Sequence, residues 1–429
     1  MGFGAENITS WYPKTLPTST TISTIDPTNS AGLYETLLEI SIRAQTETNV
    51  VKLYYLSRQF RGAAASLTII SQQQYLATAT ATQYFPQITE EMFNATLNLK
   101  SLHWESNIYA TVLSLPGNGI FAILFLALMI FFSIIFCKSR LRYFGMCMSC
   151  ASALEFIGYL ARFIAHFNWS NKDLFLCQII TLTVAPTFTM AGIYFLLAQF
   201  IVLHGRKYSV LRPLWFSFVF LIGDLVSLLV QGGGGIYAAV AISQLQNTRP
   251  GTWIMVGGLG FQVGCMTLFL VLYIDFINRL YFRANPTIKF SIRRTFQLLF
   301  NTLEGRLLRQ ELEPYYEPSL AFIRKRSFFY YLPLVILISS IFIYIRCIYR
   351  MIELSQGWRG YLITHEGFVL TLDAMMVFLA CSLYVPFHPR HIFGKDISIS
   401  NSLEIPMKKK RLKKMKTEVQ LWSSMQAGH

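Results

Sequence analysis

Charge is scarce in this sequence, because Asp, Glu, Lys and Arg together make up only 14% of its 429 residues. Soluble globular domains contain about 25% charged residues. Hydrophobic residues account for 53% of the chain and aromatic residues for 15%, including 35 Phe. This composition excludes an ordinary soluble domain. It predicts a membrane protein in which many Phe side chains face lipid.

Cysteine is absent from the first hundred residues, and the seven cysteines that occur lie within or beside apolar stretches. A disulfide framework is therefore excluded. The N-terminal region also lacks a signal-peptide core and any apolar run long enough to span a membrane. Residues 1–107 are expected to form a polar, partly disordered tail. It is rich in Ser, Thr and Pro from Thr9 to Ser30, and segments such as Leu33 to Ile42 are candidate amphipathic helices.

Three further absences narrow the function. An intramembrane metal enzyme needs several His or Cys beside acids, but of seven histidines only His365 lies near an apolar segment. No glycine-rich phosphate motif with Lys is present for ATP use. The Asp-Arg-Tyr and Asn-Pro-x-x-Tyr motifs of seven-span receptors are missing, as is a Lys for a retinal Schiff base. The sequence thus predicts no enzyme, no metal and no other cofactor, with a receptor as an alternative.

Seven apolar segments follow the tail, each long enough at 1.5 Å per residue to cross or nearly cross a hydrocarbon core of about 30 Å. We therefore expect an all-α polytopic membrane protein with a seven-transmembrane helix bundle in residues 108–386 and a basic tail in residues 387–429. The predicted spans are Gly119–Phe136, Tyr143–Ala165, Leu174–Leu203, Leu214–Ile236, Thr252–Ile277, Tyr330–Tyr349 and Thr364–Val385.

The basic residues between the spans predict the orientation. Only Lys172, Arg249 and Arg359 occupy one set of loops, whereas the alternate loops and the C-terminal tail carry the great majority. The positive-inside rule then places the N-terminus outside and the C-terminus in the cytoplasm. Glycosylation acceptors are used only on the outer side, and all three sequons fall there in this topology. They begin at Asn7, Asn94 and Asn168.

The net charge of +15 fits a membrane surface better than nucleic acid, because most Lys and Arg sit beside apolar spans. The run KKKRLKKMK, Lys408 to Lys416, is expected to bind anionic lipid of the inner leaflet. A solvated tail or a trafficking signal explains the same run equally well. The sequence does not indicate an oligomeric state.

The segment from Phe216 to Gly235 organises the rest of the chain, because it carries Asp224 near the middle of a predicted span. Gln231 follows seven residues later, two helical turns away, so both side chains lie on one helix face that leads to a four-glycine run. An acid at this depth costs several kcal/mol unless it faces a partner or a wet cavity. Asp224 is therefore a candidate functional residue. The alternative is an acid that only pins helix packing through a buried hydrogen bond.

The same seven-residue spacing recurs in three other spans, which predicts polar stripes facing a common interior. Five acids against three bases would leave excess negative charge there unless some acids are protonated. Such an interior would suit a cationic amphiphile or protons. The acids Asp224, Asp373 and Glu155 fall near mid-membrane and form the predicted floor, and the others lie toward the outer half. The recurring residues are Glu155 with Arg162, Arg346 with Arg350 and Glu353, and Glu366 with Asp373.

Proline and glycine add two features. Pro186 must break or kink the third span and free a carbonyl, and with Gln178 and Tyr194 it either lines a pathway or only shapes the packing. Gly257, Gly258 and Gly260 in the fifth span, with Gln262, predict a smooth face for close helix contact.

From about Tyr109 to Phe387 the chain resembles the fungal lipid-translocating exporter family, the RTA-like family named for aminocholesterol resistance. The resemblance implies seven spans in the plasma membrane and movement of amphiphilic lipids. The stretches HGRKYSVL, GDLVSLLVQ and GWRGYLITHE are most similar to members that give tolerance to sphingoid long-chain bases, and other members are linked to porphyrin uptake or to azole and sterol tolerance. The long N-terminal tail departs from the family pattern. The matching motifs are Glu155-Phe-Ile-Gly-Tyr159 with Arg162, Ala185-Pro186 with Ala191 and Tyr194, Asp224-Leu-Val-Ser227 with Gln231, Gly258 to Gln262, Arg346 to Glu353 with Gly357, and Glu366 with Asp373.

The expected function is accordingly the export or translocation of sphingoid long-chain bases, with the membrane acids holding the ammonium group. A regulator of lipid asymmetry that moves no substrate itself fits the same residues.

Overall fold

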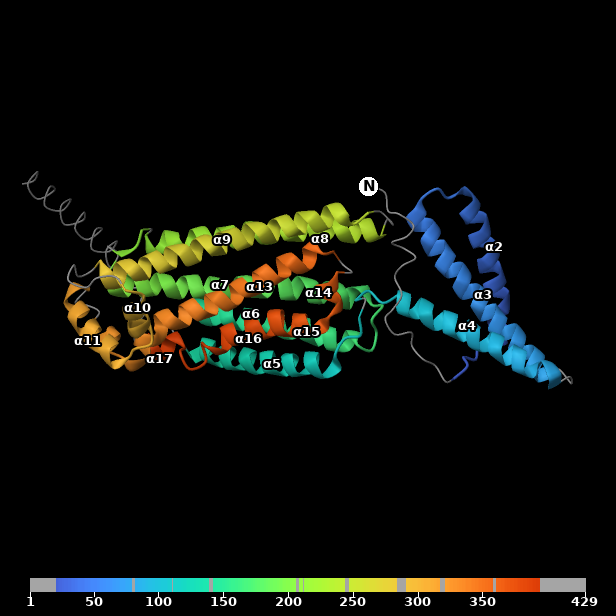
Figure 1. Ribbon diagram of the computed structural model, residues 1–429, viewed down its shortest axis with the longest axis horizontal. Helices are drawn as coiled ribbons and strands as arrows, with labels where there is room; N and C mark the ends of the chain where they lie inside the picture. Colours follow the sequence, from blue (N-terminus) through green and yellow to red (C-terminus); the bar gives the residue numbers. More distant parts are fainter. Residues whose placement is uncertain are drawn as a thin grey trace, which may run out of the picture. The chain divides into compact units, whose positions relative to one another are not determined.

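A computed structural model describes most of the chain, and every regular element in its described parts is helical (Figure 1). The predicted basic run Lys408–Lys416 and the sequon at Asn7 lie outside these parts. The chain divides into two compact units, residues 1–111, 168–171 and 239–248 in the first and the remainder in the second. All seven cysteines are free. The described residues are 21–78, 82–109, 111–138, 142–205, 208–210, 212–243, 247–283, 291–316, 321–357 and 360–393.

Up to Glu105, the described residues of the first unit form the α-helices α2 (Ser30–Thr46), α3 (Val50–Thr78) and α4 (Phe85–Glu105), with short 3-10 turns η1 (Pro27–Asn29) and η2 (Thr82–Tyr84). A small apolar core of Ala65, Ile69, Met92 and Ala95 joins α3 to α4. Glu105 at the end of α4 accepts ion pairs from Arg58 and Arg61 of α3, at 3.4 and 3.0 Å. The tail is thus far more helical than its composition indicated, although the amphipathic pattern at Leu33–Ile42 falls within α2.

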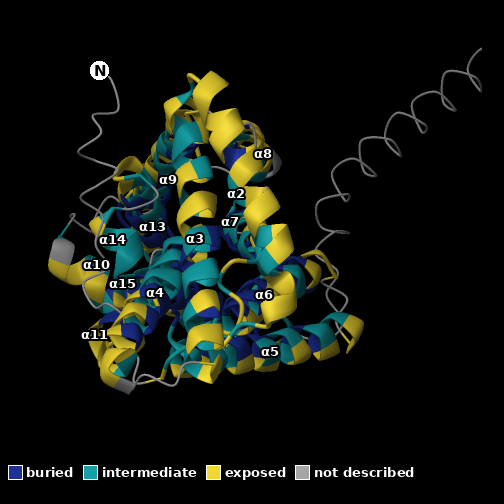
Figure 2. Ribbon diagram, turned by 90° about the vertical axis from the view of Figure 1, so that its right-hand side faces the viewer, coloured by how far each residue is buried: buried dark blue, intermediate teal, exposed yellow. Residues whose placement is uncertain are grey.

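The second unit contains six helices that are long and apolar enough to cross a membrane, within the residues described. Each contains, or nearly contains, one of the first six predicted spans, so the fold class is confirmed for this part of the chain. Many of their large apolar residues are exposed, as lipid-facing positions must be. Exposed ribbon on α5 is visible in Figure 2. The helices are α5 (Leu115–Lys138), α6 (Arg142–Ala165), α7 (Lys172–His204), α8 (Pro213–Ser243), α9 (Arg249–Phe282) and α13 (Leu332–Ser355).

The seventh predicted span is helical but irregular, and it is not among these six. After α14 (Tyr361–Thr364), a helical run passes through α15 (Glu366–Phe368), a π-helical turn η7 (Val369–Ala374) and α16 (Met375–Ser382). Such π turns are rare and concentrate at functional sites. The count of seven spans and the direction of the termini remain predictions.

Proline at position 186 does not end its helix, because α7 continues from Lys172 to His204. Glycines set how closely α7 and α9 meet their neighbours. A Cβ on Gly158 of α6 would lie 2.5 Å from Leu182 Cδ2 of α7. A Cβ on Gly234 of α8 would lie 2.7 Å from the Gly251 carbonyl oxygen of α9. The four-glycine run therefore does admit another backbone, at Gly234.

Not every glycine singled out in the sequence has this role. A Cβ on Gly257 would meet nothing within 4 Å, and one on Gly260 would touch only the sulfur of Met351 at 3.9 Å. Gly258 alone of that group makes a close contact, with Gln231 of α8. The predicted smooth face of the fifth span is therefore narrower than expected.

Short helices lie between α9 and α13 and after α16. They are α10 (Ile292–Leu299), α11 (Leu303–Leu312), α12 (Ala321–Arg324), the 3-10 turns η4 (Glu313–Tyr315) and η6 (Ser327–Tyr331), and α17 (Pro389–Phe393). Leu298, Leu312, Ile323 and Ile392 from these segments join the same apolar core as the long helices.

Candidate membrane-embedded polar site

The ionisable residues predicted to face the interior are buried, except Arg350, which is partly exposed. Most of them meet as two groups. In the first, Arg162 of α6 pairs with Glu366 of α15, with 2.9 Å between Nη2 and Oε1. Asn118 of α5 donates to the same Oε1 at 2.6 Å and accepts from Arg162 Nε at 3.0 Å. The backbone N–H of Ser114 donates to the other carboxylate oxygen. Three helices are thus joined around one fully partnered carboxylate.

The second group centres on Asp373 in the π turn η7. Arg346 Nε lies 2.6 Å from Asp373 Oδ1, and Arg350 Nη2 lies 2.5 Å from Oδ2, both from α13. Arg350 also pairs with Glu353 at 2.9 Å. One acid therefore receives two guanidinium groups, which compensates its burial. Asp373 and Glu353 are each only 1% exposed.

Arg346 makes a further contact that ties this group to α7. Its Nη2 donates a hydrogen bond to the backbone carbonyl oxygen of Leu182. A helical carbonyl normally accepts from the N–H four residues later, and that residue is Pro186, which has no N–H. The carbonyl that proline frees is thus taken by an arginine. An unpaired backbone carbonyl in a membrane costs several kcal/mol of free energy unless it accepts a hydrogen bond.

Two acids remain without a cation among the described side chains. Glu155 of α6 is 1% exposed, and its Oε1 has no hydrogen-bond partner there. Arg346 and Arg350 act on it electrostatically, but both are bound to Asp373. Asp224 of α8 is fully buried, and only its Oδ2 is partnered, by the hydroxyl of Tyr194 at 3.0 Å. A buried carboxylate without a counter-ion must either hold a proton or take up a cation.

Gln231 shares the buried face of α8 with Asp224 but has separate partners. Its Nε2 donates to Ser227 Oγ at 2.6 Å and to Gln262 Oε1 of α9 at 3.1 Å. Ser227 in turn donates to the Gly258 carbonyl oxygen at 2.8 Å. This chain of hydrogen bonds sits where Gly258 lets α8 and α9 approach, which is a packing role. Gln231 is therefore not brought together with the charged groups.

Sequence reasoning found most of these residues and missed one. Asn118 lies in the predicted membrane domain, one residue before the first predicted span, and it was not among the predicted site residues. The feature that could have identified it is a polar amide side chain placed directly before an apolar segment. Glu366 and Asp373, predicted to share a face, contact different helices. The π turn between them holds more residues per turn than an α-helix, so a spacing of seven no longer returns to the same side.

Comparison with known proteins agrees with the resemblance found in the sequence. Residues 148–396 match the family described as RTA1 like protein. This chain belongs to the RTA1-like family. Within that family, the chain is 37% identical over 265 residues to Sphingoid long-chain base transporter RSB1 of Saccharomyces cerevisiae, a match that covers 61% of the chain and 68% of the relative.

Two other Saccharomyces cerevisiae relatives are more distant. Protoporphyrin uptake protein 1 is 26% identical over 247 residues, covering 57% of this chain and 68% of its own length. Protein RTM1 is 26% identical over 234 residues, a match that covers 54% of this chain and 63% of the relative. No solved structure matches the chain. All three matches are shorter than the chain, and the family match begins at residue 148, after the N-terminal helical unit.

Proposed function

We propose that this RTA1-like protein moves cationic amphiphilic lipids, namely sphingoid long-chain bases, across the plasma membrane and so gives tolerance to them. The observation that carries the proposal is the presence of two deeply buried acids, Asp224 and Glu155, that have no cation among the described side chains. The name of the 37% identical relative supports the same substrate class.

In this mechanism the ammonium group of the lipid binds at Asp224 or Glu155, while its alkyl chain lies against the apolar outer surface of the helices. Tyr194 orients the Asp224 carboxylate through its hydroxyl. Asp373 already holds Arg346 and Arg350, so it acts by positioning these cations near Glu155 rather than by binding substrate. Proton exchange at the unpaired acids supplies the coupling, since the sequence has no ATP motif.

The supporting topology has seven spans, an outer N-terminus and a cytoplasmic C-terminus. Asn94 on α4 and Asn168 are both exposed and belong to the first unit, as use of these sequons on the outer side requires. The basic run Lys408–Lys416 would meet anionic lipid on the inner side.

Purified protein in liposomes tests the proposal. We expect a labelled sphingoid base to leave the loaded leaflet faster than in protein-free liposomes, and an N-acylated analogue without the positive charge to show no such acceleration. A pH gradient across the liposome should change the rate for the base. Tolerance in cells without any transport in liposomes would instead identify a regulator of lipid asymmetry and refute the proposal.

A further inference from the structure

The segment between α9 and α13 forms a tightly closed helical hairpin of α10 and α11. Thr302 caps α11 by accepting the Gly305 N–H at 3.3 Å, and Arg309 donates to the Leu298 carbonyl oxygen at 2.7 Å. Gly305 itself lies so near α10 that a Cβ there would fall 2.1 Å from the Gln297 carbonyl oxygen. The outward faces of the two helices are therefore held in fixed positions.

Each of those outward faces carries a pair of large exposed apolar residues. Phe296 and Phe300 on the α10 side are 57% and 51% exposed, and Leu303 and Leu307 on α11 are 77% and 58% exposed. Each pair is spaced four residues apart, so its members lie on one side of their helix. Leu298, Leu299 and Leu312 cover the inward side and are buried. Exposed ribbon on α11 is visible in Figure 2. Large exposed apolar residues that are gathered rather than scattered mark a contact surface.

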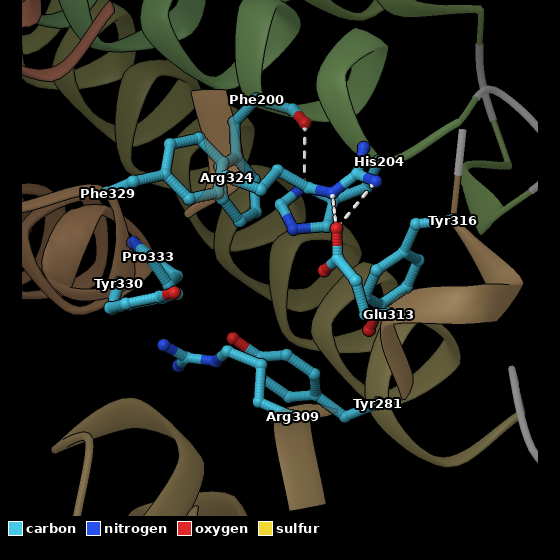
Figure 3. Close-up of a pocket in the computed structure, with 10 residues that line it drawn as sticks. All are labelled: Phe200, His204, Tyr281, Arg309, Glu313, Tyr316, Arg324, Phe329, Tyr330 and Pro333. Carbon is cyan, nitrogen blue, oxygen red and sulfur yellow. Dashed lines mark hydrogen bonds and ion pairs between the residues drawn. The ribbon is translucent and has the colours of Figure 1, made fainter. Parts of the chain in front are cut away.

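The hairpin is fastened to the ends of the membrane helices (Figure 3). Arg309 and Arg324 line the pocket behind the hairpin. The guanidinium carbon of Arg309 lies 4.4 Å from the ring centre of Tyr330. Arg324 pairs with Glu313 at 2.9 Å and donates a hydrogen bond to the Leu203 carbonyl oxygen at 2.7 Å. Burial raises the pKa of the nearby Tyr316 well above its usual value, so its hydroxyl stays a donor, to Leu280 of α9 at 3.1 Å. The hairpin thus cannot move far from α7 and α9.

Its height relative to the membrane follows from α8 and α9. Trp215 lies exposed in the first turn of α8, and the partly exposed pair Asp275–Arg279 lies about one turn before the end of α9. Amphipathic aromatic side chains and charged pairs of this kind mark the boundary between lipid and water. Leu280, to which the segment after α11 is bonded, follows directly on Arg279. The hairpin therefore lies at the membrane surface.

We propose that the α10–α11 hairpin is an interfacial anchor, with Phe296, Phe300, Leu303 and Leu307 inserted into the cytoplasmic leaflet. Arg293, Arg294 and Arg306 are exposed beside these residues and complement anionic headgroups. Of the two neighbouring exposed acids, Glu304 is bound by the amide of Gln297 and Glu311 lies farther along α11. The leaflet is the occupant that fits, because the surface combines apolar insertion with positive charge on the side that the positive-inside rule assigns to the cytoplasm.

A fluorescent probe placed by cysteine substitution tests this in nanodiscs. The full chain carries Cys137→Ser, to remove the exposed native thiol, and either Leu303→Cys or Leu307→Cys. We expect the attached probe to shift its emission to the blue, to be quenched by lipid carrying a spin label near the headgroup, and to be protected from iodide. Lys325→Cys, an exposed charged position after α12, is the matched control and should be quenched by iodide only.

Equal iodide quenching at Leu303 and Lys325 would overturn the anchor. Protection at Leu303 without lipid quenching would also overturn it, because another protein segment or a second copy would then cover the surface. Charge is tested separately. In discs with phosphatidylserine, the double substitution Arg293→Gln and Arg294→Gln should lower lipid quenching at Leu303 to the level seen in discs of phosphatidylcholine alone. The same quenching with and without the arginines would exclude the headgroup contact.

Discussion

Arg346 takes the place of the backbone N–H that Pro186 lacks. The guanidinium donates to the Leu182 carbonyl oxygen and at the same time pairs with Asp373. The turn of α7 that ends at Pro186 and the π turn in the last helical run are thus held by one side chain from α13. We therefore expect a change in the charge of Asp373 to affect the hydrogen bond between Arg346 and α7.

This linkage predicts non-additive effects on stability. Arg346→Gln should destabilise the protein by about 3 to 5 kcal/mol, because it leaves a buried charge poorly compensated. Pro186→Ala restores an N–H for Leu182, so it should be more favourable in the Arg346→Gln background than alone, by about 1 kcal/mol. Unfolding of purified single and double variants in detergent measures the difference. Strictly additive free energies would show that the two residues are independent.

Asp224→Asn separates a charge role from a packing role. The amide keeps the size and the contact with Tyr194 but cannot hold a proton or a cation. We expect normal surface amounts and loss of tolerance to sphingoid bases. Asp275→Asn, at the half-exposed end of α9, is the control and should keep tolerance. Normal tolerance of Asp224→Asn at normal surface level would leave Asp224 as a packing residue.

The glycines of α8 offer a matched pair. Gly234→Ala places a Cβ against the Gly251 backbone, which has no side chain to move aside, so a loss of about 1 to 3 kcal/mol is expected. Gly233→Ala meets nothing within 4 Å and should be neutral or stabilising by up to about 1 kcal/mol. Thermal unfolding of both variants gives the comparison, and similar losses would contradict the close α8–α9 contact.

His388, between α16 and α17, makes stability fall in mild acid. It is fully buried against Phe144, and burial, with help from His391 and Arg390, lowers its pKa from 6.5 to about 3. The unfolded chain binds the proton more readily, so stability is complete above pH 6.5 and is lost progressively as pH falls toward 3. At pH 5 the cost is about 2 kcal/mol. His388→Gln should flatten this part of the profile of unfolding free energy against pH.

Orientation can be checked directly. A tag at Met1 should be accessible outside intact cells and one at His429 only after permeabilisation, because the basic loops all fall on the C-terminal side in a seven-span arrangement. Both tags on one side would mean an even number of spans, as the six long apolar helices alone would give.

The sequence predicted the long helices and the buried acids well, because hydropathy and a fixed helical period are enough to place them. It could not predict which arginine pairs with which acid. Whether Arg346 serves Asp373 or Glu155 depends on which helices are neighbours, and the π turn at Val369–Ala374 removes the period on which the shared face of Glu366 and Asp373 was based. Most of the N-terminal helix content was not predicted, for a different reason. The core that joins these helices is small, Ala65, Ile69, Met92 and Ala95, so the surrounding polar sequence shows little helical periodicity of apolar residues.

The bond between Arg346 and Leu182 also has an evolutionary consequence. Because the acceptor is a backbone atom, this bond does not constrain the side chain at position 182, which is constrained instead by its place in the apolar core and by its contact with Gly158. The need for the donor is set instead by proline four residues later. Across RTA1-like sequences, loss of the proline should therefore remove one of the two demands on the arginine, leaving only its pair with Asp373. The positions of Pro186 and Arg346 should then covary although their side chains need never touch.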